Sequence, residues 1–367
     1  MVRITGFKFV VAAALVLSST TITAFHGASA AYDSHHGASA VYVSRTQTTP
    51  AGRQIQQHCQ SQNGQPVAYT ASSYIYNGGV LWQPPLDIEC RDLFYGAGGR
   101  AGAPDTSVPF TYVRRSKSGT QKKIIVKDVH GHEWTVKFGH EARPETAATR
   151  IVWAVGYHVD QDYFVPYARI VGEKDIEACD VRFERRDDGY KETGHWSWKE
   201  NPFVGTREFE GLKVVMALLK NWDLKTSNND IVIRKKTTGP GIYYVADLGA
   251  TLGLTASFWN RLPLFGNMPA MVGFSTGKAK GNPPAFADER FIKDVSGGRV
   301  YFYSQRTSVR KMLNGVSVES ARWMGNWLGR LSDKQLADAF CASGFSDAET
   351  RLYVSVLRAR IMELQQL

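Results

Sequence analysis

Two short loops carry the side chains that phosphate chemistry would need. Asp223 and Asn228 stand five positions apart, between an apolar run at 212–219 and a strand-like run at 230–233. A second carboxylate, Asp247, follows in an apolar stretch at 243–249. In phosphoryl transfer one Asp orients the attacking hydroxyl group, while an Asn and another Asp hold Mg²⁺ against the phosphates. The set therefore predicts phosphoryl transfer, although an Asx-rich turn and an Asp at a strand end would give the same local pattern.

The two loops resemble motifs of the protein kinases. Asp223-Leu224-Lys225-x-x-Asn228 resembles their catalytic loop, and Asp247-Leu248-Gly249 resembles their metal-binding Asp-Phe-Gly. The resemblance implies that Asp223 accepts the proton of the hydroxyl group and that Lys225 steadies the transferred phosphate. It also implies that Asn228 and Asp247 hold Mg²⁺, with Asn229 as an alternative to Asn228.

The chain departs from typical eukaryotic protein kinases at several positions. Asn221-Trp222 stands in place of His-Arg, Leu248 replaces Phe, and no Ala-Pro-Glu follows Asp247. The five-residue spacing between Asp and Asn also occurs in HipA-type and lipid kinases. The resemblance therefore implies an atypical kinase-like fold, nearest in motif to those two groups over about residues 110–255.

Three strand-like runs precede these loops, at 110–113, 124–127 and 133–138. They predict a small antiparallel sheet that covers a nucleotide. The loop after the first run, Ser118-Gly119-Thr120-Gln121-Lys122, resembles the Ser-Gly-x-Gln-x-Lys nucleotide loop of HipA-type kinases, with the last Lys at Lys123. The resemblance implies that Gly119, Gln121 and Lys122 contact the phosphates of ATP.

Lys137 follows in the third run, where alternation points it opposite to its apolar neighbours. An edge-strand Lys facing water would fit this pattern too. The resemblance implies instead the Lys that contacts the α- and β-phosphates and pairs with a helix Glu. A helix predicted over 143–156 has Glu145 in its first turn, which makes Glu145 the candidate partner and Glu141 the alternative. A first-turn Glu also stabilises a helix through its dipole.

The remaining stretches are less specific. Residues 163–170 resemble an extended strand leading to a hinge, and the charged run Arg182–Tyr190 is typical of a hairpin or surface loop. Helices are predicted at 318–331 and 346–364, with capping boxes beginning at Ser332 and Ser346.

The N-terminus has the pattern of a secretory signal peptide over residues 1–30. Arg3 and Lys8 precede a largely apolar run, and Ala28-Ser29-Ala30 offers a cleavage site. This predicts export to the periplasm or beyond the cell, with an uncleaved anchor as the alternative. Residues 31–52 continue as a small, polar segment that predicts a disordered tether. No later stretch is long and apolar enough to span a membrane.

The composition is that of a soluble globular protein with a basic surface. The formal net charge is +10, and 43% of the residues are hydrophobic. The charge favours acidic partners such as nucleotides, but it is also common in exported bacterial proteins that have none. No specific nucleic-acid motif is present. Four cysteines in an exported chain suggest disulfides, with Cys59–Cys90 the preferred pair and Cys341 a buried free thiol in a helix.

Together these features predict an α+β, two-lobed kinase-like fold. After an N-terminal extension at 53–107, a small antiparallel-sheet lobe at 108–172 would bind the nucleotide. A larger, mainly helical lobe at 173–367 would carry the catalytic groups. The implied activity moves the γ-phosphoryl group of ATP to a hydroxyl group with Mg²⁺, on a protein, lipid or small-molecule acceptor.

Two alternatives remain open because ATP is scarce outside the cytoplasm. One is an exported pseudokinase-like binding module for an anionic ligand or a partner protein. The other is a nucleotidyl transferase on the same fold.

Overall fold

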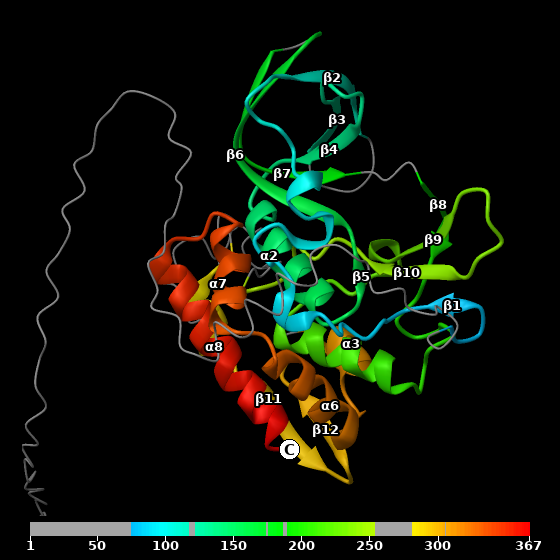
Figure 1. Ribbon diagram of the computed structural model, residues 1–367. Helices are drawn as coiled ribbons and strands as arrows, with labels where there is room; N and C mark the ends of the chain where they lie inside the picture. The colour runs from blue at the N-terminus through cyan, green and yellow to red at the C-terminus, as the bar shows by residue number, and fades with distance from the viewer. Residues whose placement is uncertain (1–74, 117–121, 174, 186–188, 254–280, 305) are drawn as a thin grey trace, which may run out of the picture. The chain divides into compact units, whose positions relative to one another are not determined.

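The described part of the chain comprises residues 75–116, 122–173, 175–185, 189–253, 281–304 and 306–367 of a computed structural model (Figure 1). The predicted signal peptide, tether and Cys59 lie outside these ranges, so export and the Cys59–Cys90 pairing stay predictions. Within these ranges, no helix combines the length and the apolar character that a membrane span requires.

A closed barrel of five strands surrounds one cluster of apolar side chains. The strand order is β2-β3-β4-β7-β6. The bounds are β2 Phe110–Arg115, β3 Lys123–Lys127, β4 Glu133–Lys137, β6 Gln161–Val171 and β7 Ile176–Arg185. Neighbouring strands run antiparallel, except that β2 and β6 pair in parallel and close the barrel. Trp134, Val136 and Phe183 belong to its core, so the residues that alternate with them point outward.

The barrel extends past residue 172, where the sequence placed the end of the small lobe, because β7 is one of its strands. The interpretation of Arg182–Tyr190 as a hairpin or surface loop is therefore wrong for its first residues. Arg182 lies in β7 and is only 2% exposed. The extended strand predicted at 163–170 is confirmed, since these residues lie in β6, which pairs with β2 and β7 in the barrel.

Two further sheets lie among the described residues. One has the order β1-β10-β9-β8, with β5 also paired to β10, and the other has the order β11-β12-β13. The bounds of the first are β1 Gly79–Val80, β5 His158–Val159, β8 Tyr190–His195, β9 Asp230–Arg234 and β10 Gly241–Val245. Those of the second are β11 Ile292–Ser296, β12 Arg299–Phe302 and β13 Val316–Ser317.

Helices contribute most of the second and larger apolar cluster. The α-helices are α2 Ala142–Ala154, α3 Arg207–Leu218, α4 Pro283–Asp288, α5 Thr307–Leu313, α6 Val318–Gly329, α7 Asp333–Cys341 and α8 Asp347–Gln365. Short 3-10 turns are η2 Ile88–Cys90, η3 Gly96–Gly98, η4 Arg100–Gly102 and η5 Thr226–Asn228. Both predicted capping boxes, at Ser332 and Ser346, are present. Cys341 is free as expected but exposed, so its predicted burial is wrong.

Helix α2 links the barrel to the helical part of the structure, since it packs against β6 and β7 as well as α7 (Figure 1). It ends before Gly156, whose φ of +97° suits glycine. A Cβ atom there would lie 2.1 Å from the main-chain oxygen of Gln83. The fold is thus α+β. Residues 49–367 form one compact unit, and the division into two lobes stays a prediction.

Candidate active site

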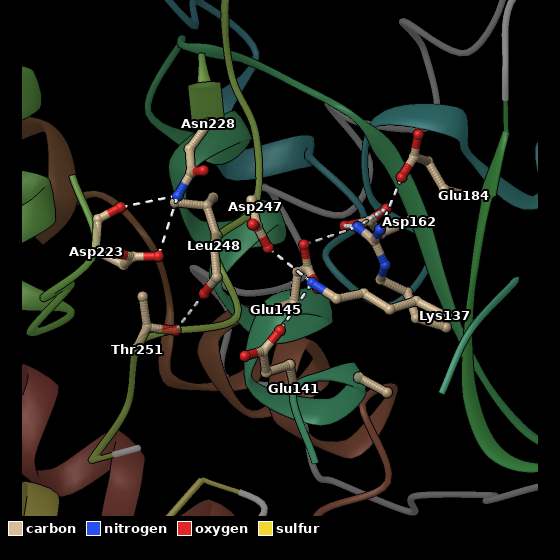
Figure 2. Close-up of polar contacts among 12 residues, drawn as sticks. Lys137, Glu141, Glu145, Asp162, Glu184, Asp223, Asn228, Asp247, Leu248 and Thr251 are labelled. Carbon is tan, nitrogen blue, oxygen red and sulfur yellow. Dashed lines mark hydrogen bonds and ion pairs between the residues drawn. The ribbon is translucent and has the colours of Figure 1, made fainter. Parts of the chain in front are cut away.

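Lys137 is buried where the end of β4 meets α2. Its neighbour Val136 faces the barrel core, so Lys137 points outward, yet only 1% of the residue is exposed. The ammonium nitrogen Nζ lies 2.9 Å from Glu145 Oε2, 2.9 Å from Glu141 Oε2 and 2.7 Å from Asp247 Oδ1 (Figure 2). The alternative of a Lys facing water is therefore wrong.

The start of α2 supplies two of these carboxylates. Glu141 occupies the N-cap position without a side-chain capping bond, and Glu145 lies in the first turn. Residues four apart at this end of a helix share one face. Both candidate partners named from the sequence therefore contact Lys137. Glu145 is the buried one, with 1% of its side chain exposed against 20% for Glu141.

Asp247 reaches Lys137 because its loop is tied to the loop of Asp223. The N–H of Ala246 donates to the main-chain oxygen of Asn228 (2.9 Å), and the N–H of Trp222 donates to that of Ala250 (3.2 Å). Asp247 itself has a φ of +50°, a left-handed conformation that non-glycine residues adopt at some cost. Such strain persists where the surrounding structure enforces it, and it is frequent at functional sites.

The Asp223 loop begins directly after α3. The N–H of Asp223 donates to Asn221 Oδ1 (2.9 Å), while Asn228 Nδ2 donates to the main-chain oxygen of Asp223 (2.9 Å) and weakly to its Oδ2 (3.5 Å). Lys225 Nζ lies 2.7 Å from Asp223 Oδ2, with 62% of its side chain exposed. Arg306 Nη1 is 3.9 Å from Asp223 Oδ1. In Figure 2, Asp247 lies between this loop and Lys137.

Asn229 has a different environment from Asn228. Its Nδ2 group donates to the main-chain oxygens of Trp196 (3.2 Å) and Lys225 (3.0 Å), and the residue is 1% exposed. The bond to Trp196 attaches the Asp223 loop to the residue that directly follows β8. Asn229 is therefore a structural residue, and Asn228 is the better candidate for a ligand.

The electrostatics of the site keep Lys137 and Asp247 charged. Burial tends to lower the pKa of Lys137, but the carboxylates, Glu145 foremost, raise it above its ordinary value. Burial tends to raise the pKa of Asp247, but the charge and hydrogen bond of Lys137 outweigh it and hold the pKa below its usual range. Burial raises the pKa of Glu145 to about 7, and the charges of Arg182 and Lys137 limit that rise.

Arg182 contacts the other oxygen of Glu145 and was not foreseen from the sequence. Its Nη1 lies 2.9 Å from Glu145 Oε1 and 2.8 Å from Asp162 Oδ1, while its Nη2 lies 2.7 Å from Glu184 Oε2. The sequence signal was present only as the alternation of Arg182 and Glu184 around the apolar Phe183. Nothing near them in the chain identifies the distant partners.

The oxygen donors fit a hard cation such as Mg²⁺, which takes one or two carboxylates and keeps several waters. The oxygens of Glu141, Glu145 and Asp247 lie within 4.8 Å of one another, but the ammonium group of Lys137 contacts one oxygen of each. The ion pair with Lys137 involves Oδ1 of Asp247. The Asn228 amide directs its NH₂ to Asp223 and leaves Oδ1 with a weak bond from Ser227 Oγ at 3.4 Å.

The predicted phosphate loop is only partly described. Gly119 and Gln121 lie outside the described residues. Lys122 is exposed, and its Nζ lies 4.6 Å from the ring centroid of Phe138. The role of these three residues stays a prediction.

Comparison with known proteins adds little to the geometry. No protein-family model matches the chain, and no curated protein matches it. Among solved structures the fold is similar to a Helicobacter pylori proinflammatory kinase, CtkA, with a TM-score of 0.41 and 13% identity. The match covers 71% of this chain and 97% of that protein. Similarity at this level does not identify a function, which must be inferred from the side chains themselves.

Proposed function

We propose that this protein is an ATP-dependent phosphotransferase with a kinase-like fold, which moves the γ-phosphoryl group of ATP to a hydroxyl group. The observation that carries the proposal is the contact between Lys137 and Asp247, 110 positions apart in the chain. It joins the buried Lys137–Glu145 pair to the Asp247 loop, which is hydrogen-bonded to the loop that contains Asp223 and Asn228. An Asx-rich turn with no catalytic role would not need a buried ammonium group from a distant strand.

Each residue has a role that follows from its contacts. Glu145 and Glu141 hold the ammonium group of Lys137 at the edge of the site, where it would bind phosphate oxygens. Asp223, held by Asn221 and Asn228, would orient the acceptor hydroxyl group and take its proton. Lys225 is exposed enough to leave Asp223 and contact the transferred phosphate.

Asp247 and Asn228 would hold Mg²⁺. Asp247 pairs with Lys137 through Oδ1, and Asn228 bonds to Asp223 through Nδ2, so Asp247 Oδ2 and Asn228 Oδ1 would be the ligand atoms. When bound, the ion would neutralise part of the charge on the phosphates. In the present structure the charge of Asp247 is balanced by Lys137. A bound nucleotide would thus exchange this ion pair for contacts of Lys137 with phosphate and of Asp247 with the metal.

Transfer from radiolabelled ATP to a mixture of candidate acceptors, with Mg²⁺, tests the proposal. We expect label from the γ-phosphate and none from the α-phosphate. Asp223→Ala should stop transfer but still bind ATP, because Asp223 faces the acceptor. Label from the α-phosphate would indicate nucleotidyl transfer. Binding of ATP without transfer to any acceptor, or no binding at all, would favour the exported binding module.

A further inference from the structure

Arg182 stands directly opposite Lys137 in the barrel. The two residues are partners in the antiparallel pairing of β4 with β7, so both side chains emerge from the same face of neighbouring strands. Like charges in this position repel each other. The carboxylate of Glu145 lies between them, with Oε2 at 2.9 Å from Lys137 and Oε1 at 2.9 Å from Arg182. Each oxygen thus contacts one cation.

Arg182 is itself fixed by hydrogen bonds to Asp162 and Glu184. Its Nη1 donates to both carboxylate oxygens of Asp162, at 2.8 and 2.9 Å, and its Nη2 donates to Glu184 at 2.7 Å. The main-chain oxygen of Asp162 accepts a bond from Arg150 Nη1 (3.1 Å), whose own side chain also bonds to the main chain at Phe94. The side chains of Lys137, Glu145, Arg182 and Asp162 are all 2% exposed or less.

The charge of Arg182 is what balances the second oxygen of Glu145. Among the described residues, Glu145 Oε1 has no aligned hydrogen bond, so the ion pair with Arg182 is its compensation. Arg182 itself does not need Glu145 for neutralisation, because Asp162 and Glu184 also contact it. The contact has a second effect on Glu145: it fixes the rotation of the carboxylate, because turning it would take Oε1 away from Arg182.

We propose that Arg182 is a positioning residue for the phosphotransfer site, which acts by fixing Glu145 and thereby Lys137. The inference rests on the proposed function. With Arg182 in place, Lys137 meets a single oxygen of Glu145 and its ammonium group stays close to Asp247 at the edge of the site. Without Arg182, Glu145 is free to turn both oxygens toward Lys137 and draw the ammonium group away from the nucleotide.

The test compares three variants for KM of ATP, kcat, direct ATP affinity and thermal stability. Arg182→Met/Asp162→Asn removes one buried charge of each sign, so it avoids an unpaired charge in the core. Arg182→Lys keeps the positive charge but lacks the planar guanidinium group that contacts Asp162, Glu184 and Glu145 at once. Glu184→Gln is the matched control, because Glu184 contacts Nη2 of Arg182 while Glu145 contacts Nη1, and its side chain is 19% exposed.

We expect the double variant to remain folded with KM for ATP raised about tenfold or more, since small displacements of a binding group are costly. Its kcat should change less than its KM. Arg182→Lys should recover part of the affinity, and Glu184→Gln should stay within about twofold of the wild type.

A double variant with the wild-type KM for ATP, whether or not its stability falls, would overturn the inference and show that Arg182 only supports the barrel. If the wild type transfers phosphate while all three variants keep its KM, the inference fails and the proposed function stands. If the wild type neither transfers phosphate nor binds ATP, the proposed function is wrong, and the inference that rests on it is wrong as well.

Discussion

The ion pair between Lys137 and Glu145 should show strong coupling in a double-mutant cycle. Both side chains are 2% exposed or less, and Nζ and Oε2 are 2.9 Å apart. Removing one partner of a buried pair costs about 3–5 kcal/mol, because the other charge is left buried without compensation. Other charges remain near each residue, so we expect Lys137→Met and Glu145→Gln each to lower the free energy of unfolding by about 3 kcal/mol.

The double variant should lose far less than the sum, since neither residue is then a lone buried charge. Neighbours of this kind couple by up to about 3 kcal/mol. With a coupling of about 2–3 kcal/mol, the double variant should lose roughly 3–4 kcal/mol instead of about 6.

An exposed pair on the same barrel provides the matched control. Lys127 and Glu133 lie on β3 and β4 with Nζ and Oε1 3.8 Å apart, and their side chains are 47% and 32% exposed. The cycle of Lys127→Met and Glu133→Gln should give a coupling below about 0.5 kcal/mol. Urea unfolding followed by tryptophan fluorescence measures both cycles. A coupling for the buried pair no larger than for the exposed pair would refute the reasoning.

Two further predictions follow from the fold. Thr206→Ala should cost about 1 kcal/mol in chemical unfolding, because the Thr206 hydroxyl accepts the N–H of Phe209 at the start of α3; no loss would show that the cap is dispensable. Gly156→Ala should cost more than about 2 kcal/mol by the same measurement, because its φ is +97° and the new Cβ would collide with the main chain at Gln83; wild-type stability would argue against this geometry.

The parts of the site that could be predicted from sequence are those with local signals. Lys137 stands in an apolar strand, and Glu145 stands in the first turn of a helix that begins near Pro144, so each pattern is complete within a few residues. The capping boxes at Ser332 and Ser346 are equally local, and both form. The order of these elements along the chain then suggested which side chains would meet.

Arg182 could not be predicted because its burial depends on distant residues. In sequence it belongs to a dense charged run, and such runs are usually solvated. Its partners Asp162 and Glu145 lie 20 and 37 positions earlier in the sequence, and only the pairing of β7 with β4 and β6 brings them together. The sequence could not decide whether Asn228 or Asn229 is the metal ligand, for a similar reason. The bond that occupies the Asn229 side chain goes to the main-chain oxygen of Trp196, which is distant in the sequence.

The affinity for ATP, measured by equilibrium dialysis with Mg²⁺ and with a chelator, tests the central claim most directly. In the wild type we expect Mg²⁺ to strengthen binding by at least about tenfold, a difference of about 1.4 kcal/mol. In Asp247→Asn, which retains an oxygen to accept a bond from Lys137 but lacks the charge for a metal ion, the affinity should be the same with and without Mg²⁺. The proposed site would be contradicted if the wild type bound ATP with the same affinity with and without Mg²⁺. It would also be contradicted if Mg²⁺ strengthened ATP binding to Asp247→Asn as much as to the wild type.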